Sequence, residues 1–406
     1  MNILFLHQNT PGQFRHLAPH LAGRGANVVF LGQRPPGSMP ANAVRWRRYP
    51  APPAPAPATH AYLRRMDNAV RTGQAVARAC LQLGRDGFQP DVAVVHPGWG
   101  EAMFLRDVFP RVRILSYCEM FYRAEGQDTG YIPETALDLD GRCRLRAWNA
   151  ELLAALDIMD RGLSPTAWQR DQHPDAYRNR IAVVHDGIPM DECAPNPGAR
   201  FAVPGRVFAP GDEVVTYVAR HLEPVRGFLT LMRALPALLR LRPQAHVVIC
   251  GADGHGYGRG PEGGGTWREA MGREAMAREA PVDPARVHFS GPLARADYLR
   301  LLQVSALHLY LSVPFVLSWS CIEALSCGCL LLGADVAPVR EVVEDGVNGA
   351  LVDGRDPDAV ARRAADMLAR RALLGGLRAQ ARAGAVAQFD VRRCLAAQTR
   401  LVEELA

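Results

Sequence analysis

Short apolar runs alternate with amphipathic segments along most of this chain. Each run has the length of a buried strand, and most end in a polar, glycine-containing loop. Strands separated by helical segments are typical of parallel sheets in α/β domains. The predicted strands are residues 2–7, 27–31, 92–95, 114–117 and 181–184 in the first half, and 214–219, 246–250, 287–290, 306–312 and 329–332 in the second.

The pattern is clearest around residues 306–332, where it predicts a strand, a loop, a short helix and another strand. Ser318 and Ser320 mark the start of the helix and Gly328 marks its end. Such a unit places a helix N-terminus at the carboxyl edge of the sheet, where free backbone N–H groups favour a phosphate. Glu323 lies in the first turns of this otherwise apolar helix, so we expect its carboxylate to hold a ribose diol.

Length and loop composition predict two domains. A chain of 406 residues exceeds the usual size of a single core. Residues 191–211 are rich in Pro and Gly and lack periodicity, which is typical of a linker. We therefore predict an α/β fold of two Rossmann-like, doubly wound domains, at 1–190 and 212–385, with a final helical segment at 386–406.

Composition excludes several classes of function. The chain has no lysine among its 47 basic residues, so mechanisms that need a P-loop lysine or a lysine Schiff base are excluded. A net charge of +6 is modest for this length and does not argue for nucleic acid. The cysteines lack metal-ligand spacing, no apolar run is long enough to span a bilayer, and the chain begins directly with a strand. We expect a cytoplasmic protein.

An arginine-bearing helix predicted at residues 61–83 suggests one kind of surface partner. Its arginines, among them Arg65, fit a solvated helix face, or peripheral contact with the inner face of a membrane.

Polar side chains follow three predicted strands of the first domain and should meet at one edge of its sheet. Gly12 and Gln13 lie in the loop after the first strand, where Gly12 either admits a ligand close to the backbone or serves a plain turn. The segment after strand 92–95 carries His96, Trp99 and Glu101, which we assign to the acceptor side. Glu119 follows strand 114–117. It is a candidate catalytic group, or simply a partner for a nearby arginine.

The segment Glu323-Ala324-Leu325-Ser326-Cys327-Gly328 resembles the signature of retaining glycosyltransferases of family 4, which have the GT-B fold. Those proteins carry a glutamate, seven residues, and then a second glutamate followed by Ala and a small-Gly turn. Glu323 matches the second glutamate. Phe315 stands where the family usually has the first, so the resemblance leaves the sugar, and catalysis itself, open.

The resemblance implies where a donor would bind. It assigns Arg220 and Arg226, after strand 214–219, to the donor diphosphate, with arginine in place of the usual lysine at the second position. Backbone at Leu293 would read the nucleotide base. The other donor-binding residues that it implies are Val316, Leu317, Ser318 and Trp319, together with Gly12 and Gln13 of the first loop.

The resemblance also implies an activity: transfer of a sugar, with retention, from a UDP- or GDP-type nucleotide sugar, without a metal or other cofactor. The two domains would face each other across a cleft, and the last helix would pack back on the first domain. The acceptor is left open as a glycan, a lipid-linked glycan or a small molecule. The expected pathway is glycan or glycoconjugate biosynthesis. Two alternatives remain, namely a sugar-nucleotide epimerase of the same fold and a non-catalytic sugar-nucleotide-binding subunit.

Overall fold

The computed structural model describes residues 1–35, 37, 44–254, 256–258, 260–278 and 281–406. These residues divide into two compact units. Unit 1 consists of Met1–Ala124, Leu137–Gly187 and Val391–Ala406, and unit 2 of Glu125–Ala136 and Ile188–Asp390. Each unit is built on its own parallel sheet, so the prediction of two doubly wound α/β domains is confirmed.

Unit 1 contains a seven-stranded sheet in the order β3-β2-β1-β4-β5-β6-β7, with every neighbouring pair parallel. The strands are β1 (Asn2–Leu6), β2 (Asn27–Gly32), β3 (Arg45–Arg48), β4 (Val92–Val95), β5 (Arg113–Tyr117), β6 (Arg161–Ser164) and β7 (Ile181–Val183). The order reverses between β1 and β4. In doubly wound folds, ligands bind beyond the carboxyl ends of the strands at such a switch point.

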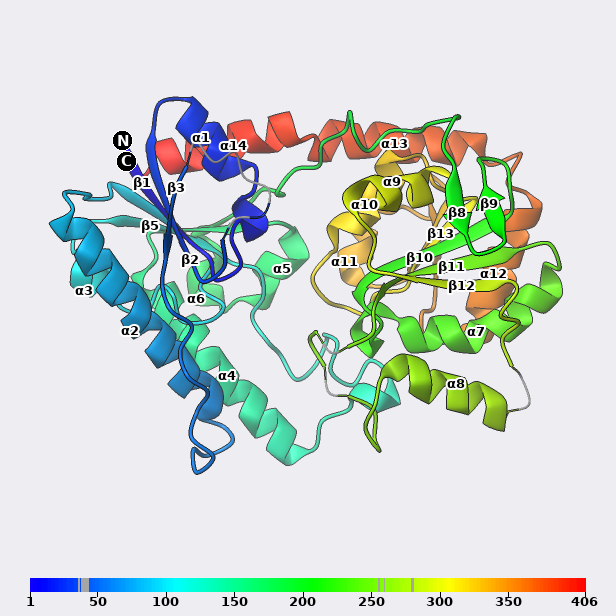
Figure 1. Ribbon diagram of the computed structural model, residues 1–406, viewed down its shortest axis with the longest axis horizontal. Helices are drawn as coiled ribbons and strands as arrows, with labels where there is room; N and C mark the ends of the chain where they lie inside the picture. The colour runs from blue at the N-terminus through cyan, green and yellow to red at the C-terminus, as the bar shows by residue number, and fades with distance from the viewer. Residues whose placement is uncertain (36, 38–43, 255, 259, 279–280) are drawn as a thin grey trace. The chain divides into compact units, whose positions relative to one another are not determined.

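Alternating side chains of these strands feed two cores, one on each face of the sheet. Leu4 and Leu6 belong to the core covered by α2 (Arg64–Arg85), α3 (Leu105–Val108) and α4 (Leu139–Ile158). Ile3 and Phe5 belong to the opposite core, covered by α1 (Leu17–Gly23) and α14 (Val391–Glu403). Figure 1 shows α2 and α4 on one side of this sheet and α1 and α14 on the other. Alternate side chains of β1 are therefore buried on opposite faces of the sheet.

The last helix, α14, is thus part of unit 1 although it follows unit 2 in the sequence. Leu401 and Val402 are buried with the strands of the first sheet, and Arg24 of α1's C-terminal end forms an ion pair with Glu403. Gln398 donates a hydrogen bond from Nε2 to the carbonyl oxygen of His185 at 2.9 Å. The core of unit 1 is therefore completed by the C-terminal end of the chain.

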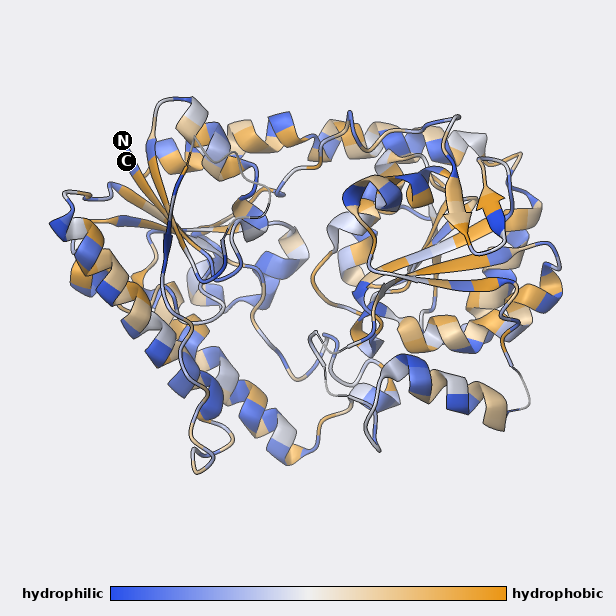
Figure 2. Ribbon diagram, viewed as in Figure 1, coloured by the Kyte–Doolittle hydropathy of each residue, from blue (hydrophilic) through white to orange (hydrophobic). Residues whose placement is uncertain are grey.

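Unit 2 repeats the same strand order in a six-stranded parallel sheet, β12-β11-β10-β13-β14-β15. Its switch point lies between β10 and β13. The strands are β10 (Val214–His221), β11 (His246–Ala252), β12 (Val287–Gly291), β13 (Leu307–Tyr310), β14 (Leu331–Ala334) and β15 (Ala350–Val352). Figure 2 shows that hydrophobic residues dominate the strands, while hydrophilic residues are most frequent on the helices and loops.

Helices cover both faces of the second sheet. One face is buried against α7 (Phe228–Leu241), α8 (Trp267–Ala277) and α12 (Pro357–Ala369). The other is buried against α9 (Arg295–Gln303), α10 (Trp319–Ser326), α11 (Ala337–Arg340) and α13 (Gly375–Phe389). Leu309 and Tyr310, neighbours on β13, belong to opposite cores. The helix predicted after Ser318 is α10, and the Ser318 side chain caps it by accepting from the amide of Ser320.

Some segments differ from the sequence-based expectations. Residues 191–211 are not a featureless linker, because β8 (Phe201–Val203) and β9 (Arg206–Phe208) form an antiparallel hairpin there. Phe201 and Phe208 bury this hairpin against the rest of unit 2. Within residues 124–146, α4 begins at Leu139, and the residues before it include a short 3-10 helix, Pro133–Thr135. Unit 1 also contains α5 (Ala167–Gln172), which the Thr166 side chain caps, and α6 (Asp175–Arg178).

Candidate active site

The candidate residues of unit 1 gather beyond the carboxyl ends of β1, β4 and β5. His7 directly follows β1 and accepts a hydrogen bond at Nδ1 from the amide of Asn9 at 2.9 Å. Its proton therefore lies on Nε2, which donates to Gln13 Oε1 at 2.7 Å. The amide of Gln13 in turn donates from Nε2 to Glu119 Oε1 at 2.8 Å. Two segments distant in the sequence, after β1 and after β5, thus form one hydrogen-bonded chain.

His96 and Trp99 close this cluster from the end of β4. His96 Nε2 lies 3.4 Å from Glu119 Oε2. The His96 ring stacks on that of Trp99, with centroids 4.8 Å apart, and its centroid lies 4.8 Å from that of His7. The predicted residues Gln13, His96, Trp99 and Glu119 are therefore brought together, and His7 joins them.

Burial and hydrogen bonding keep one group of this cluster neutral and another ionised. Burial, and then the nearby His96, lowers the pKa of His7 to about 3, so His7 is neutral at pH 7. For Glu119, burial works to raise the pKa, but interactions with His96, His7 and Gln13 outweigh it and leave the pKa below its usual value. The site therefore holds an ionised carboxylate in a fixed orientation beside a neutral imidazole.

Gly12 is required by the close approach of its loop to His7. Its φ of +51° lies in the left-handed region, and a Cβ there would stand 2.3 Å from His7 Nε2. Gly12 is therefore more than a plain turn residue, because any side chain would displace the imidazole from Gln13.

Glu101 does not join the cluster, contrary to the prediction that it serves the acceptor side. Its side chain is fully buried and accepts from the hydroxyl of Tyr49 at 3.2 Å and from the amide of Trp99 at 3.2 Å. Burial raises the pKa of Glu101 to about 7. Glu101 supports the loop that carries Trp99, and it lacks the exposure that direct contact with an acceptor needs.

Arg65 also differs from the expected exposed helix face. Its Nε donates to Glu151 Oε1 at 2.5 Å, and its guanidinium lies over the rings of Tyr122 and Trp148. A second hydrogen bond from Arg65 reaches the carbonyl oxygen of Gly98, next to Trp99. Arg65 thus helps to fix the loop after β4 instead of offering its charge to a membrane surface.

Arg226 lies at the switch point of unit 2. Its segment follows β10, and its Nη1 donates to the carbonyl oxygen of Val316 at 2.9 Å and to Ser312 Oγ at 3.3 Å, both in the loop after β13. Among the described residues, no carboxylate forms an ion pair with Arg226. The structure therefore confirms the convergence of these two segments and leaves a half-buried cation with only neutral oxygen partners.

Glu323 is buried in α10 and bound by two residues of α9 that the sequence analysis did not identify. Arg295 Nη1 donates to Glu323 Oε1, and the Tyr298 hydroxyl donates to Oε2, each at 2.5 Å. Burial, and then the Glu323 carboxylate, raises the pKa of Tyr298 well above its ordinary value, so the phenol keeps its proton. Arg295 and Tyr298 are three residues apart, a spacing that places two side chains on one face of a helix and that can be read from the sequence.

The other predicted donor residues lie around this region without joining one set of contacts. Arg220 is exposed near the end of β10. Leu293 follows β12 and packs partly against the core beneath it. Of the loop before α10, Val316, Ser318 and Trp319 are half-buried, while Leu317 is buried. The amide of Ser318 donates to the Tyr310 hydroxyl, so this loop is fixed to the end of β13.

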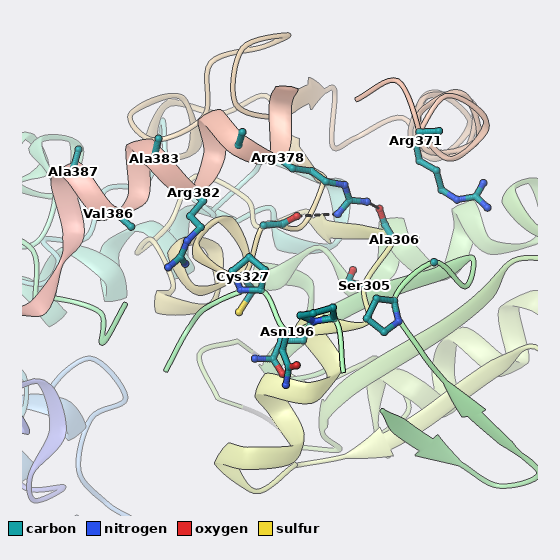
Figure 3. A pocket seen from close by; sticks show the side chains of 18 residues that line it. Asn196, Ser305, Ala306, Cys327, Arg371, Arg378, Arg382, Ala383, Val386 and Ala387 are labelled. Carbon is teal, nitrogen blue, oxygen red and sulfur yellow. Dashed lines mark hydrogen bonds between the residues drawn. The ribbon is translucent and has the colours of Figure 1, made fainter. Parts of the chain in front are cut away.

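A cavity of about 1110 Å³ lies elsewhere on unit 2, at residues that precede β13 and β14. These mark the amino edge of the sheet, opposite to Arg226. Figure 3 shows Arg378 and Arg382 of α13 reaching into this region. Arg378 donates to the carbonyl oxygens of Gly328 and Ala306, and Arg382 donates to that of Ser326. Both arginines therefore bind backbone carbonyl oxygens of unit 2.

Each of the two Rossmann-type sheets has polar groups at its switch point, the place where doubly wound α/β folds bind ligands. The comparisons with known proteins agree. Residues 24–193 match the family model described as "Glycosyl transferase family 4 group", and residues 203–384 match "Glycosyl transferases group 1". Together these two models account for most of the chain, which belongs to the glycosyltransferases of the GT-B fold.

Relatives of known name are glycosyltransferases. A D-inositol 3-phosphate glycosyltransferase of Streptomyces avermitilis is 31% identical over 220 residues, which are 52% of this chain and 44% of that protein. The enzyme of the same name from Geodermatophilus obscurus is 30% identical over 264 residues, which are 63% of this chain and 55% of that protein. The chain thus matches about half the length of these relatives.

Solved structures agree over the whole length. Anabaena HepE in complex with UDP-glucose has a TM-score of 0.71 at 16% identity, with 100% of both chains covered. Sucrose-phosphate synthase from Thermosynechococcus elongatus has a TM-score of 0.73 at 18% identity, covering 100% of this chain and 99% of the other. At these identities the likeness establishes the fold alone.

Within the described residues, no helix has both the length and the apolar character needed to cross a bilayer.

Proposed function

We propose that this protein transfers a sugar from a nucleoside-diphosphate sugar to an acceptor hydroxyl, with retention at the anomeric carbon. The observation that carries the proposal is Arg226. Partly buried cations normally pair with a carboxylate, because desolvation without compensation is costly. Arg226 is held at a switch point by two neutral oxygen atoms, and no described carboxylate balances its charge. A diphosphate would supply the missing negative charge.

The residues around Arg226 fit the remaining parts of a donor. The loop that contains Val316 and Ser318 leads into the N-terminus of α10, whose amides favour phosphate oxygens. Glu323 lies in the same helix, and each of its oxygen atoms has one further lone pair to accept from a ribose hydroxyl. Arg220 adds positive charge from the exposed end of β10.

The proposed chemistry uses this charge in the transition state. As the glycosidic bond to the diphosphate breaks, negative charge grows on the leaving group, and Arg226 with the α10 amides stabilises it. The acceptor hydroxyl attacks from the face that the leaving group occupied and passes its proton to a phosphate oxygen. Glu119, ionised and oriented by Gln13, accepts a hydrogen bond from a substrate hydroxyl. No step requires a metal ion or another cofactor.

The comparisons suggest which substrates to test first. HepE was solved with UDP-glucose, which favours a UDP-sugar donor over a GDP-sugar. Two relatives are named for D-inositol 3-phosphate, so a small phosphorylated polyol is the first acceptor to test, ahead of glycans and lipid-linked glycans.

Phe315 favours a second candidate, a non-catalytic nucleotide-sugar-binding subunit. Its ring is buried at 2% exposure in the loop after β13, and it offers no hydrogen bond to a sugar hydroxyl. A protein that binds a nucleotide sugar without transferring it would tolerate this residue.

Nucleotide release separates the two candidates. Purified protein would be incubated with UDP- and GDP-sugars, with and without acceptors, while free nucleotide and the anomeric configuration of the product are measured. We expect Arg226→Ala to lower turnover about 100-fold, because the charge it opposes peaks in the transition state, and to weaken nucleotide binding far less. Arg370→Ala, which removes an exposed helical ion pair with Asp366, is the matched control. Tight nucleotide binding with no release under any acceptor would refute transfer.

A further inference from the structure

Two aromatic rings flank the guanidinium of Arg226. Its Cζ lies 5.4 Å from the ring centroid of Phe315 and 5.8 Å from that of Tyr257. The two rings also contact each other in a T-shaped arrangement, with centroids 4.9 Å apart. Both distances to Arg226 lie within the range in which a cation is attracted by an aromatic face.

Tyr257 reaches this position because its loop is fastened to the end of β10. Glu223, 1% exposed, accepts at Oε2 from the amides of Gly256 and Tyr257, each at 3.0 Å. Gly256 lets the loop approach so closely, since a Cβ there would stand 2.7 Å from the His221 ring and 2.9 Å from Glu223 Oε1. A buried carboxylate is thus used to place one aromatic residue of a glycine-rich loop.

This arrangement holds Arg226 without neutralising it. A carboxylate at position 315 would pair with the guanidinium and cancel the charge that a diphosphate needs. Aromatic faces restrict the guanidinium while leaving its charge intact, and both described hydrogen bonds of Arg226 use Nη1. Within the described part of the chain, the Nη2 and Nε donors are therefore left to an anionic ligand.

We propose that Tyr257 and Phe315 are positioning residues that form an aromatic clamp on Arg226 and aim its guanidinium at the donor diphosphate. This inference rests on the proposed function, because it takes a nucleoside diphosphate as the ligand. The buried Phe315 thereby acquires a role that is different from binding sugar hydroxyls, and Glu223 acts through the backbone of the loop.

A double-mutant cycle tests the clamp. Tyr257→Ala should lower turnover about tenfold, the size expected for one cation–π contact, and Tyr257→Phe should restore it because the ring face is kept. In an Arg226→Ala background, Tyr257→Ala should change turnover by less than about twofold, since the residue on which the ring acts is gone. Phe315→Leu, which keeps most of the buried volume, should behave like Tyr257→Ala.

Affinity for UDP and GDP, measured by titration calorimetry on the wild type and on the same five variants, keeps the test independent of turnover. Additive effects of Tyr257→Ala and Arg226→Ala, or a Tyr257→Phe variant as impaired as Tyr257→Ala, would overturn the clamp while leaving the transferase function standing. If the wild-type protein binds nucleotide without turnover, the transferase function fails, and coupling in the dissociation constants alone decides the clamp. A protein that binds no nucleoside diphosphate overturns both.

Discussion

Replacing Glu323 probes both the fold of unit 2 and the proposed ribose contact. Glu323→Ala removes the partner of Arg295 Nη1 and of the Tyr298 hydroxyl, two contacts of 2.5 Å. Breaking a fully buried pair costs about 3–5 kcal/mol, because the remaining charge is left without compensation. The side chain of Glu323 is 6% exposed but that of Arg295 is 36% exposed. Solvent screening at Arg295 reduces the expected cost to about 2–3 kcal/mol.

Calorimetry would measure this cost as a shift in the melting temperature. For a unit of this size, about 1 kcal/mol corresponds to roughly 2–4 °C, so Glu323→Ala should lower the transition of unit 2 by about 5–10 °C. Asp366→Ala, which breaks an exposed i,i+4 pair with Arg370, should shift it by less than about 3 °C. Equal melting temperatures for wild type and Glu323→Ala would refute the reasoning about the buried pair.

Glu323→Gln separates folding from binding. It keeps a carbonyl oxygen for Tyr298 and most of the volume, so the melting temperature should fall much less than in Glu323→Ala. Hydrogen bonds to a charged acceptor exceed neutral ones by about 1 kcal/mol, so UDP should bind about fivefold more weakly. If Glu323→Gln and Glu323→Ala both bind UDP with wild-type affinity, the carboxylate serves the fold alone and the ribose assignment is wrong.

Three further predictions concern the candidate site of unit 1 and the buried histidines of both units. Gly12→Ala should lower transfer about tenfold by displacing His7, whereas Gly25→Ala, which has a similar left-handed φ but nothing within 4 Å of its Cβ, should leave transfer unchanged. Glu119→Gln should lower turnover at least tenfold with little change in melting temperature; equal turnover would remove Glu119 from the mechanism. The melting temperature should fall as pH drops from about 6.5 towards 4, because buried neutral histidines bind protons only after unfolding; a flat profile would contradict this. Burial lowers the pKa of four such histidines, to about 3 for His7 and to about 4 for His173, His185 and His308.

Most of the fold is predictable from the sequence because the central strands of both sheets are buried on two faces. Such strands are continuous apolar runs, and each is followed by a polar turn. The strands that escaped prediction, β3, β6, β8, β9 and β15, are short and lack this signal, and β6 reads Arg-Gly-Leu-Ser. The edge strand β3 reads Arg-Trp-Arg-Arg and is mostly exposed. The strands β8 and β9 have three residues each and lie in a segment rich in Pro and Gly.

The candidate site was predictable only where its residues directly follow strands. Gln13, His96 and Glu119 are polar residues beyond apolar runs, which the doubly wound topology brings to one edge of the first sheet, and Arg226 has the equivalent place at the edge of the second. Tyr257 lies in a long glycine-rich loop, and its place depends on amides bound by Glu223, a tertiary contact without a local pattern. The assignment of Glu101 to the acceptor side shows the limit of this rule. Its position after β4 resembles that of His96, but its side chain is fully buried.

The two switch points carry complementary chemistry on the same strand order. In unit 1, buried imidazole and carboxylate groups form a hydrogen-bonded chain that fixes an ionised Glu119, which suits the orientation of hydroxyl groups. In unit 2, Arg226 is a cation without a described carboxylate partner, which suits a leaving group that gains negative charge. The proposed transfer uses both kinds of site. A protein that only bound a nucleotide would need the cationic site alone, and nothing in that role would require Gly12 to pack against His7 and keep Glu119 oriented.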